Sequence, residues 1–229
     1  MSGSIGFVIP TLNEEEAIEP TLDTIPADEL EAHGYTVEVL IVDGDSDDRT
    51  PEIARKWGAR VVTEPRSGYG RAYKTGFAET DADVIVTGDA DGTYPFELAT
   101  DLVQRLEQDD LDFITTNRLA HLEDGAMTPK HRFGNWVLST SCRVLFGTSF
   151  EDSQSGMWVF RRSVLDRIEI TDDGMPMSEE IKIEAFQHPD VGAIEVDIPY
   201  RERIGEVKLE SWNDGLRNLT FLFEKRFTH

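Results

Sequence analysis

The first half of the chain alternates between short apolar runs and amphipathic segments, and this alternation restricts the possible folds more than any other feature. Five runs are predicted to be strands: residues 4–10, 36–42, 59–63, 83–87 and 112–116. Helices are expected between them: residues 14–25, 48–57, 69–79 and 95–107, the first with Asn13 as N-cap. Strands alternating with helices of this length indicate an α/β fold with a mostly parallel sheet.

The second half carries a different pattern, with helices expected at 127–145, 178–186 and 211–227 and strands at 156–160 and 193–199. No Pro-, Gly- or Ser-rich linker divides the chain, so one domain over residues 1–229 is predicted. Residues 1–117 would bind a nucleotide, and residues 118–229 would shape the acceptor site and end in an amphipathic helix. The apolar stripe of that helix is expected to face the core rather than a membrane. Its members are Trp212, Leu216, Leu219, Leu222 or Phe223, and Phe227.

Acidic residues outnumber basic ones by 45 to 22, which gives a formal net charge of −23. Such a surface repels nucleic acid and anionic lipid, so no nucleic-acid partner is expected. The acids are scattered along the chain, which is typical of proteins from a halophilic archaeon, because molar salt screens their repulsion. One cysteine (Cys142), no secretory signal and no long apolar run indicate a cytoplasmic protein, at most peripheral to the membrane.

The sequence Asp89-Ala90-Asp91-Gly92 follows directly after the fourth predicted strand. In parallel sheets ligands bind beyond the carboxyl ends of the strands. Carboxylates are suitable ligands for Mg²⁺ or Mn²⁺, which bind proteins through one or two carboxylates together with phosphates. A solvated Asp/Gly turn is the simpler alternative, but the position at a strand end favours a metal–diphosphate site.

Polar motifs also follow other predicted strands. Pro10 to Glu14 and Asp43 to Ser46 come after the first two, where they could bind a nucleoside or simply cap helices. Arg66-Ser-Gly-Tyr-Gly-Arg71 opens the third helix, and its glycines allow close approach to a ligand. It matches neither the dinucleotide-binding fingerprint nor the phosphate loop of ATPases, which argues against both classes.

These motifs together resemble glycosyltransferase family 2 with the GT-A fold, a Rossmann-like three-layer αβα sandwich. The segments IPTLNE, VDGDS, GYGRAYKTGF, TGDADGTYP and RIGEVKL occur in the family's order. They are most similar to the branch of dolichyl-phosphate mannose synthase and the polyprenyl-phosphate glucosyltransferases. The resemblance implies an enzyme that uses a nucleoside-diphosphate sugar and Mg²⁺ or Mn²⁺.

The resemblance assigns roles residue by residue. The nucleotide sugar would be bound by Pro10, Leu12, Glu14, Asp43, Gly68, Lys74, Asp89, Ala90 and Asp91, with the metal on Asp89 and Asp91. Arg118, Arg132, Arg203 and Lys208 would hold a lipid phosphate, and the last two would close over the phosphates. Tyr94 stands where relatives often have histidine, and Val207 replaces a serine.

The basic residues support a phosphate acceptor independently, because guanidinium groups match phosphate oxygens. A hydroxyl acceptor needs a general base, whereas a phosphate monoester is already anionic near neutrality. Asp152 is the best base candidate, followed by Glu179 and Glu180.

The predicted function is inverting transfer of a hexose from a GDP-mannose- or UDP-glucose-type donor to polyprenyl or dolichyl phosphate at the membrane surface. Asp91, Asp152 and Arg203 would form the catalytic group. Two alternatives stay open: transfer to a sugar or small-molecule hydroxyl with Asp152 as base, and a non-catalytic nucleotide-sugar-binding protein. A membrane partner protein also stays open.

Overall fold

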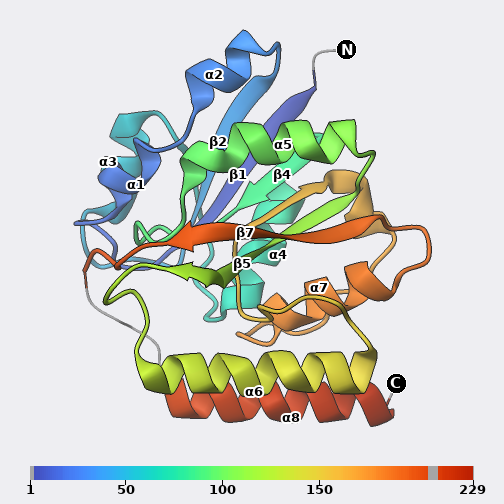
Figure 1. Ribbon diagram of the computed structural model, residues 1–229. Helices are drawn as coiled ribbons and strands as arrows, with labels where there is room; N and C mark the ends of the chain where they lie inside the picture. Colours follow the sequence, from blue (N-terminus) through green and yellow to red (C-terminus); the bar gives the residue numbers. More distant parts are fainter. Residues whose placement is uncertain (1–2, 206–210, 229) are drawn as a thin grey trace.

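The computed structural model describes the backbone of residues 3–205 and 211–228, and the side chains of residues 3–205 and 215–227. Its centre is a seven-stranded sheet of order β3-β2-β1-β4-β6-β5-β7 (Figure 1). The strands are β1 Ser4–Thr11, β2 Thr36–Asp43, β3 Arg60–Thr63, β4 Val84–Thr87, β5 Phe113–Leu122, β6 Trp158–Arg161 and β7 Ala193–Tyr200. Every pairing between described strands is parallel except the two made by β6, so the predicted mostly parallel α/β sheet is confirmed.

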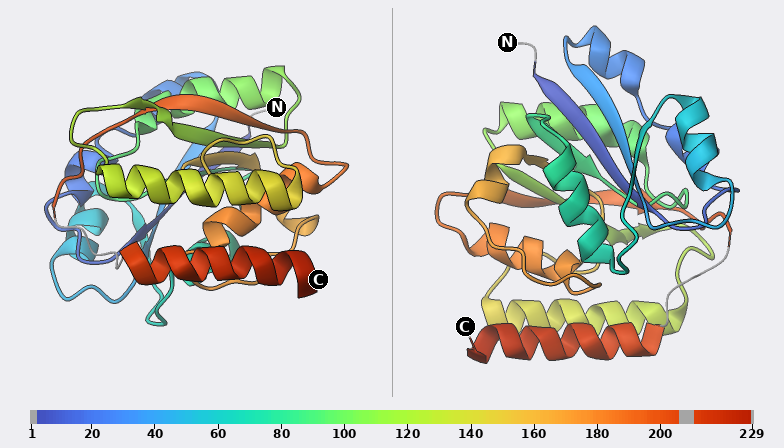
Figure 2. Two further views of the ribbon diagram at one scale, coloured as in Figure 1. Left: turned by 60° about the horizontal axis from the view of Figure 1, so that its bottom comes forward. Right: turned by 180° about the vertical axis from the view of Figure 1, so that it is seen from behind.

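Helices cover both faces of this sheet (Figures 1 and 2). The apolar side chains of α1 Ile18–Leu22, α2 Ala27–Ala32, α3 Thr50–Trp57 and α5 Ala99–Gln108 pack into one core cluster on one face. Those of α4 Tyr69–Glu79 and α7 Met177–Gln187 pack into a second cluster on the other face. Short 3₁₀ turns at Phe96–Leu98 and Arg162–Asp166 connect these elements. The result is the predicted three-layer αβα arrangement.

The reversed strand β6 brings two loops to the same edge of the sheet. Because β6 is antiparallel to both neighbours, it begins beside the carboxyl end of β4: Val159 pairs with Val86, and Trp158 pairs with Thr115 in the first part of β5. Thr87 fixes the junction, since its hydroxyl donates to the Gly156 carbonyl at 2.8 Å and accepts from the Trp158 amide at 2.9 Å. The loop before β6 therefore meets the loop after β4.

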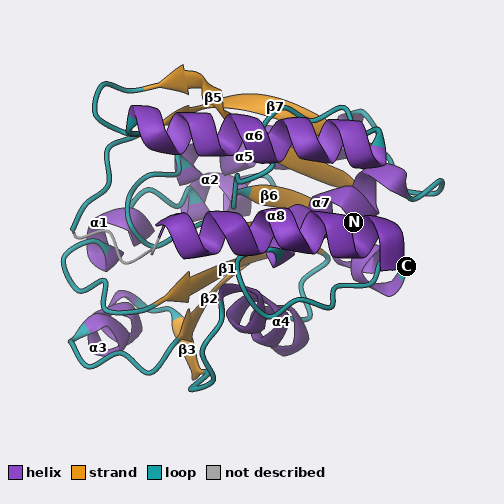
Figure 3. Ribbon diagram, turned by 90° about the horizontal axis from the view of Figure 1, so that it is seen from below, coloured by secondary structure: helices purple, strands orange, loops and turns teal. Residues whose placement is uncertain are grey.

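Two long helices, α6 Pro129–Phe146 and α8 Ser211–Thr228, lie side by side beyond α7 and run in the same direction (Figures 1 and 3). Their inner faces enclose a third apolar cluster: Leu138, Cys142, Phe150, Ile183 and Leu222. Six large apolar side chains on the two helices are instead between 47% and 78% exposed: Phe133, Trp136, Val144, Leu216, Phe223 and Phe227.

These exposed positions correct one expectation about the C-terminal helix. Leu219 and Leu222 face the core as predicted, but Leu216, Phe223 and Phe227 do not. Residues 216, 223 and 227 share one side of a helix with a 3.6-residue period, about 120° around the helix from Leu222. Trp212 lies outside the residues whose side chains the structure describes.

The first predicted helix is shorter than expected. Only residues 18–22 of the predicted 14–25 form a helix, α1, and it is followed by α2, which was not predicted. Asn13 does not cap α1, because it adopts a left-handed conformation with φ of 54°. Its amide donates to Ser46 Oγ and its side chain accepts from the Asp47 amide, so these bonds hold it against the neighbouring turn.

Candidate active site

Asp91 lies in a tight turn after β4 and is almost fully buried. Its Oδ1 accepts hydrogen bonds from the Thr93 amide (3.1 Å) and the Thr93 hydroxyl (2.6 Å). Its Oδ2 accepts from Arg203 Nη1 at 2.6 Å. Gly92 has φ of 78°, a conformation that a glycine adopts without strain, and this permits the turn. The local sequence thus fixes one carboxylate at the edge of the sheet.

Asp89, at the start of the same turn, is enclosed by two tyrosines and a glycine. Its Oδ1 accepts from the Tyr69 hydroxyl at 3.3 Å. The Tyr94 hydroxyl accepts from the Gly156 amide at 2.7 Å, and a Cβ on Gly156 would overlap the Tyr69 hydroxyl. Burial and the neighbouring Asp91 raise the pKa of Asp89 to about 7.

This pair fits a hard divalent cation. Both donors are carboxylates in one turn, and oxygen ligands suit Mg²⁺ and Mn²⁺. Across the residues that the structure describes, no group of three or more His, Cys, Asp or Glu side chains could hold a metal. A two-carboxylate site of this kind suits an ion that takes its other ligands from a diphosphate and water.

The ends of β1 and β2 form the adjoining part of this edge. The Gly44 amide donates to the Thr11 carbonyl at 2.8 Å, which joins the two strand ends. Asp43, the last residue of β2, is buried, and its Oδ1 accepts from Ser46 Oγ at 2.6 Å. Leu12 is exposed beside Gly44, and Pro10 lies in β1 one pair before the Thr11–Asp43 pair. The structure thus brings Pro10, Leu12 and Asp43 to one edge, as the family motifs imply.

Arg203 connects this region with the metal-site turn. Its guanidinium forms ion pairs with Asp91 and with Glu14 at the start of the loop after β1. The backbone supports the contact, because the Ile204 amide donates to the Asp91 carbonyl at 2.9 Å. The Arg201 amide donates to the Thr93 carbonyl at 3.1 Å. Residues 201–204 therefore lie across the turn that carries Asp91.

Arg118 and Asp152 form a buried, two-pronged ion pair on the other side of the site. Arg118 Nε donates to Asp152 Oδ2 at 2.7 Å and Nη2 donates to Oδ1 at 2.9 Å. Arg118 is 7% exposed and Asp152 is 0% exposed. Burial alone would raise the pKa of Asp152, but the Arg118 guanidinium holds it below the ordinary value. The Arg118 charge also acts on Asp89, where it offsets part of the rise in pKa that burial and Asp91 cause. Sequence reasoning selected Arg118 and Asp152 but did not pair them.

Other predicted site residues lie elsewhere or make other contacts. Lys74 donates to the Thr171 carbonyl at 3.0 Å and pairs with Asp173, so these contacts tie α4 to the 171–174 loop. Gly68 packs against the same loop, because a Cβ there would overlap the Asp173 carbonyl oxygen. Ala90 is buried and its carbonyl accepts from Thr21 Oγ1.

Arg132 is exposed on α6, and Lys208 lies outside the described residues. Glu179 and Glu180 are fully buried in α7. Glu180 accepts hydrogen bonds from Thr171 and pairs with Lys225.

Three contributors were not predicted: Tyr69, Tyr94 and Gly156. Tyr69 and Tyr94 belong to sequence motifs that were selected for their glycines and aspartates. The glycines on either side of Tyr69 were the only sequence pattern that pointed to that tyrosine. Gly156 carries no local signal, since only the strand reversal brings it to Asp89.

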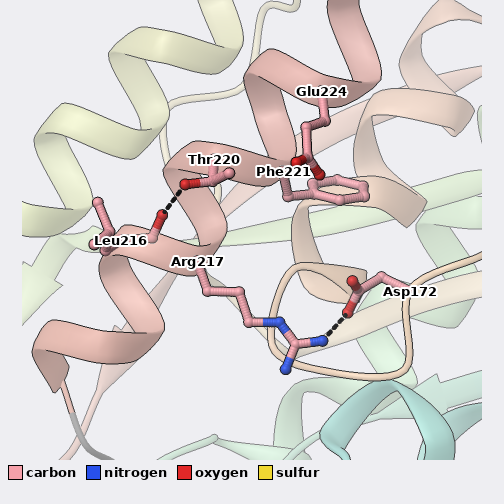
Figure 4. A pocket seen from close by; sticks show the side chains of 6 residues that line it. All are labelled: Asp172, Leu216, Arg217, Thr220, Phe221 and Glu224. Atoms are coloured by element: carbon pink, nitrogen blue, oxygen red, sulfur yellow. Dashed lines mark hydrogen bonds and ion pairs between the residues drawn. The ribbon is translucent and has the colours of Figure 1, made fainter. Parts of the chain in front are cut away.

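A cavity of about 490 Å³ lies between α8 and the loop at Asp172 (Figure 4). Its lining residues are Asp172, Leu216, Arg217, Thr220, Phe221 and Glu224. None of them belongs to the turn at Asp89 and Asp91, so the size of a cavity does not identify the site; the arrangement of charges does.

The α/β fold, with carboxylates and arginines gathered at one edge of its sheet, suits a transferase. The family model for glycosyl transferase family 2 matches residues 7–169, and the chain belongs to this family. It is a glycosyltransferase.

Two relatives from Haloferax volcanii are similar over most of this chain. The low-salt glycan biosynthesis hexosyltransferase Agl6 is 36% identical over 223 residues, which are 96% of this chain and 53% of the relative. A dolichyl-phosphate hexose transferase is 37% identical over 211 residues, 92% of this chain and 89% of the relative. The chain therefore spans about half the length of the first relative and most of the second.

Among solved structures, a glucosyl-3-phosphoglycerate synthase from Mycobacterium tuberculosis, in complex with Mn²⁺, UDP and glucosyl-3-phosphoglycerate, has a similar fold. The TM-score is 0.77 at 22% identity, with 98% of this chain and 80% of the other covered. This likeness concerns the fold alone.

Proposed function

We propose that the enzyme transfers a hexose, with inversion, from a nucleoside-diphosphate sugar of the GDP-mannose or UDP-glucose type to a polyprenyl or dolichyl phosphate. The observation that carries the proposal is the placement of the Arg118–Asp152 pair at the same sheet edge as Asp89 and Asp91. One edge thereby offers a site for a metal-bound diphosphate and a guanidinium for a second phosphate. The name of the dolichyl-phosphate hexose transferase of Haloferax volcanii supports such an acceptor.

Donor binding is assigned to the edge formed by β1, β2 and β4. Asp43 and the exposed Leu12 would contact the nucleoside, and Asp89 and Asp91 would hold Mg²⁺ or Mn²⁺. The ion supplies positive charge that stabilises the departing diphosphate. Arg203, already beside Asp91, would exchange its carboxylate partners for diphosphate oxygens.

Acceptor binding is assigned to Arg118. Asp152 takes its Nε and Nη2, which leaves Nη1 for a phosphate oxygen. A phosphate monoester needs no general base, because its second pKa is about 6. Its oxygen attacks the anomeric carbon from the face opposite the diphosphate, and the bond to the diphosphate breaks as the new one forms. Asp152 then orients Arg118, and its lowered pKa makes it a poor base.

The outer faces of α6 and α8 are assigned to the membrane surface where a polyprenyl lipid resides. Six large apolar side chains point away from the body there, and the exposed Arg132 adjoins Phe133 on α6. Aromatic side chains with neighbouring basic residues suit an interfacial helix. None of the described helices is long and apolar enough to cross a bilayer.

The test is turnover of a panel of UDP- and GDP-sugars with Mn²⁺, in molar salt, with dolichyl phosphate or with soluble sugars. Transfer to dolichyl phosphate is expected, and exclusive transfer to a soluble hydroxyl would refute the proposal and restore the base role of Asp152. Asp91→Asn should lower turnover by about 100-fold or more, the scale of losing one electrostatic contact to the transition state. Asp101→Asn, in the first turn of α5, is the matched control and should retain activity. Donor binding without turnover of any acceptor would favour a binding protein.

Membrane contact is tested separately by flotation with phosphatidylcholine vesicles. Phe223→Ser with Phe227→Ser should abolish flotation, because each phenylalanine contributes up to about 1.5–3 kcal/mol when buried. Thr220→Ser, an exposed residue on the same helix, should float like the parent. Unchanged flotation of the double variant would exclude α8 as the membrane contact.

A further inference from the structure

α8 carries a buried polar side chain in the middle of its inner face. Asn218 is 2% exposed and lies one turn before Leu222, which belongs to the apolar cluster under α6 and α8. Asparagine is a weak helix former, and Asn218 Oδ1 is buried with no partner among the described residues. An apolar residue would attach the helix to the body at lower cost. Stability alone therefore does not explain an asparagine at this position.

The asparagine contacts the loop that organises the acceptor side of the site. Asn218 Nδ2 donates to Gln154 Oε1 at 2.8 Å. Gln154 stands in the loop of residues 151–156, here called the acceptor loop. The backbone amide of Gln154 donates at 3.0 Å to Asp152 Oδ1, the oxygen that also accepts from Arg118 Nη2. A short series of hydrogen bonds thus runs from α8 to Arg118.

α7 holds the other end of the Gln154 side chain. Gln154 Nε2 donates to Ser153 Oγ at 3.0 Å and to Glu179 Oε1. Glu179 is fully buried, and burial raises its pKa to about 8. In a buried network few alternative partners exist, so a shift of either helix breaks a bond that water does not replace. The side chain of Gln154 is therefore held in place by α7, which belongs to the core, and by α8, which lies at the surface.

The same surface helix bears the outward apolar side chains. Asn218 and Leu222 lie on its inner side, whereas Leu216, Phe223 and Phe227 lie on its outer side. A lipid surface that takes up Phe223 and Phe227 restrains the whole helix, because a helix of 18 residues moves as a unit. The position of Asn218 is then restrained as well.

We propose that Asn218 and Gln154 are positioning residues that couple the seating of α8 on a lipid surface to the geometry of Arg118 on β5, which the acceptor loop holds through Asp152. The proposal rests on the proposed function for its phosphate acceptor. Its consequence is that the enzyme transfers sugar faster when it sits on a bilayer, even to an acceptor dissolved in water.

The experiment uses the full chain in molar salt, a short water-soluble polyprenyl phosphate, and empty phosphatidylcholine vesicles. Because the acceptor is not in the vesicles, any stimulation must pass through the protein. Vesicles are expected to raise kcat about 2- to 10-fold, the effect of one hydrogen bond, with donor KM unchanged. Asn218→Leu should float with vesicles and show no stimulation. Gln154→Leu should behave alike, and the double variant should be no worse than either single one.

Leu222→Ala is the matched control, since it weakens the same inner face without touching the hydrogen bonds. It should lose thermal stability and keep the stimulation, which a purely structural role of Asn218 does not predict. Normal stimulation of Asn218→Leu, or no stimulation of the parent enzyme bound to vesicles, would overturn the proposal.

Hydrogen exchange gives a readout that does not depend on turnover. Vesicles should slow amide exchange in the acceptor loop of the parent enzyme and leave Asn218→Leu unchanged. If no polyprenyl phosphate is turned over but this response appears, the proposed acceptor fails and the coupling stands. If transfer proceeds without the response, only the coupling fails.

Discussion

Removing the carboxylate of Asp152 should destabilise the protein severely, because it leaves the Arg118 charge buried without a partner. Both side chains are nearly or fully buried, and two hydrogen bonds of 2.7 and 2.9 Å join them. Breaking one partner of such a pair costs about 3–5 kcal/mol. At about 2–4 °C per kcal/mol for a chain of this size, Asp152→Ala should lower Tm by about 6–20 °C.

Thermal and guanidinium unfolding in molar salt measure this loss. Asp109→Ala removes the exposed partner of Arg105 and should cost at most about 0.5 kcal/mol. The pair Arg118→Met with Asp152→Leu should recover much of the stability, because apolar side chains can replace a buried ion pair, yet it should stay inactive.

The pH dependence supplies a further check on the same pair. Because the folded pKa of Asp152 lies below its ordinary value of 3.8, the stabilisation is present above about pH 4 and lost on acidification. The gap in stability between parent and Asp152→Ala should therefore close at acid pH. A loss below about 1 kcal/mol at neutral pH would refute the reasoning, because the charge would then not be desolvated. Intact stability with abolished transfer to hydroxyl acceptors would point to a base instead.

Three further outcomes are expected. Glu179 has a folded pKa of about 8, above its ordinary value of 4.5, so its contribution to the free energy of unfolding declines as pH rises from about 4.5 to 8. Glu179→Gln should remove that decline, as measured by unfolding titrations at pH 5, 6.5 and 8. Gly156→Ala should abolish donor turnover, because the added Cβ would overlap the Tyr69 hydroxyl. The Cβ of Gly134→Ala on α6 meets no atom within 4 Å, so this control should raise the free energy of unfolding by about 0.5–1 kcal/mol. With a net charge of −23, Tm should rise steeply between low and molar salt, and a flat dependence would contradict the halophilic interpretation.

The order of elements could be predicted from the sequence because alternation and strand-end acids are local patterns. These patterns predict that Asp43 and the Asp89–Asp91 turn lie at one edge of the sheet. The contact of Arg203 with Glu14 joins residues 189 positions apart, and only the family motif suggested that they share a site.

Other features depend on tertiary contacts that leave no local trace. Asparagine is a common N-cap residue, but the hydrogen bonds of Asn13 to Ser46 and Asp47 hold it in a left-handed conformation. Arg118 and Asp152 lie 34 positions apart, and their pairing requires the reversed strand β6. The stripe on α8 has two apolar sides, and periodicity alone does not show which one meets the body.

The reversed strand also dictates when the two halves of the protein can join. Among the described strands, β5 pairs with β6 and β7 alone, and both of these follow it in the chain. During synthesis, β1 to β4 can therefore pair early, while the free edge of β4 stays open until residues 158–161 emerge. An open edge is a template for unwanted strand pairing. The second half of the chain thus covers the edge of β4 that the first half leaves exposed. Truncation before β6 should yield a chain that aggregates rather than a smaller nucleotide-binding domain.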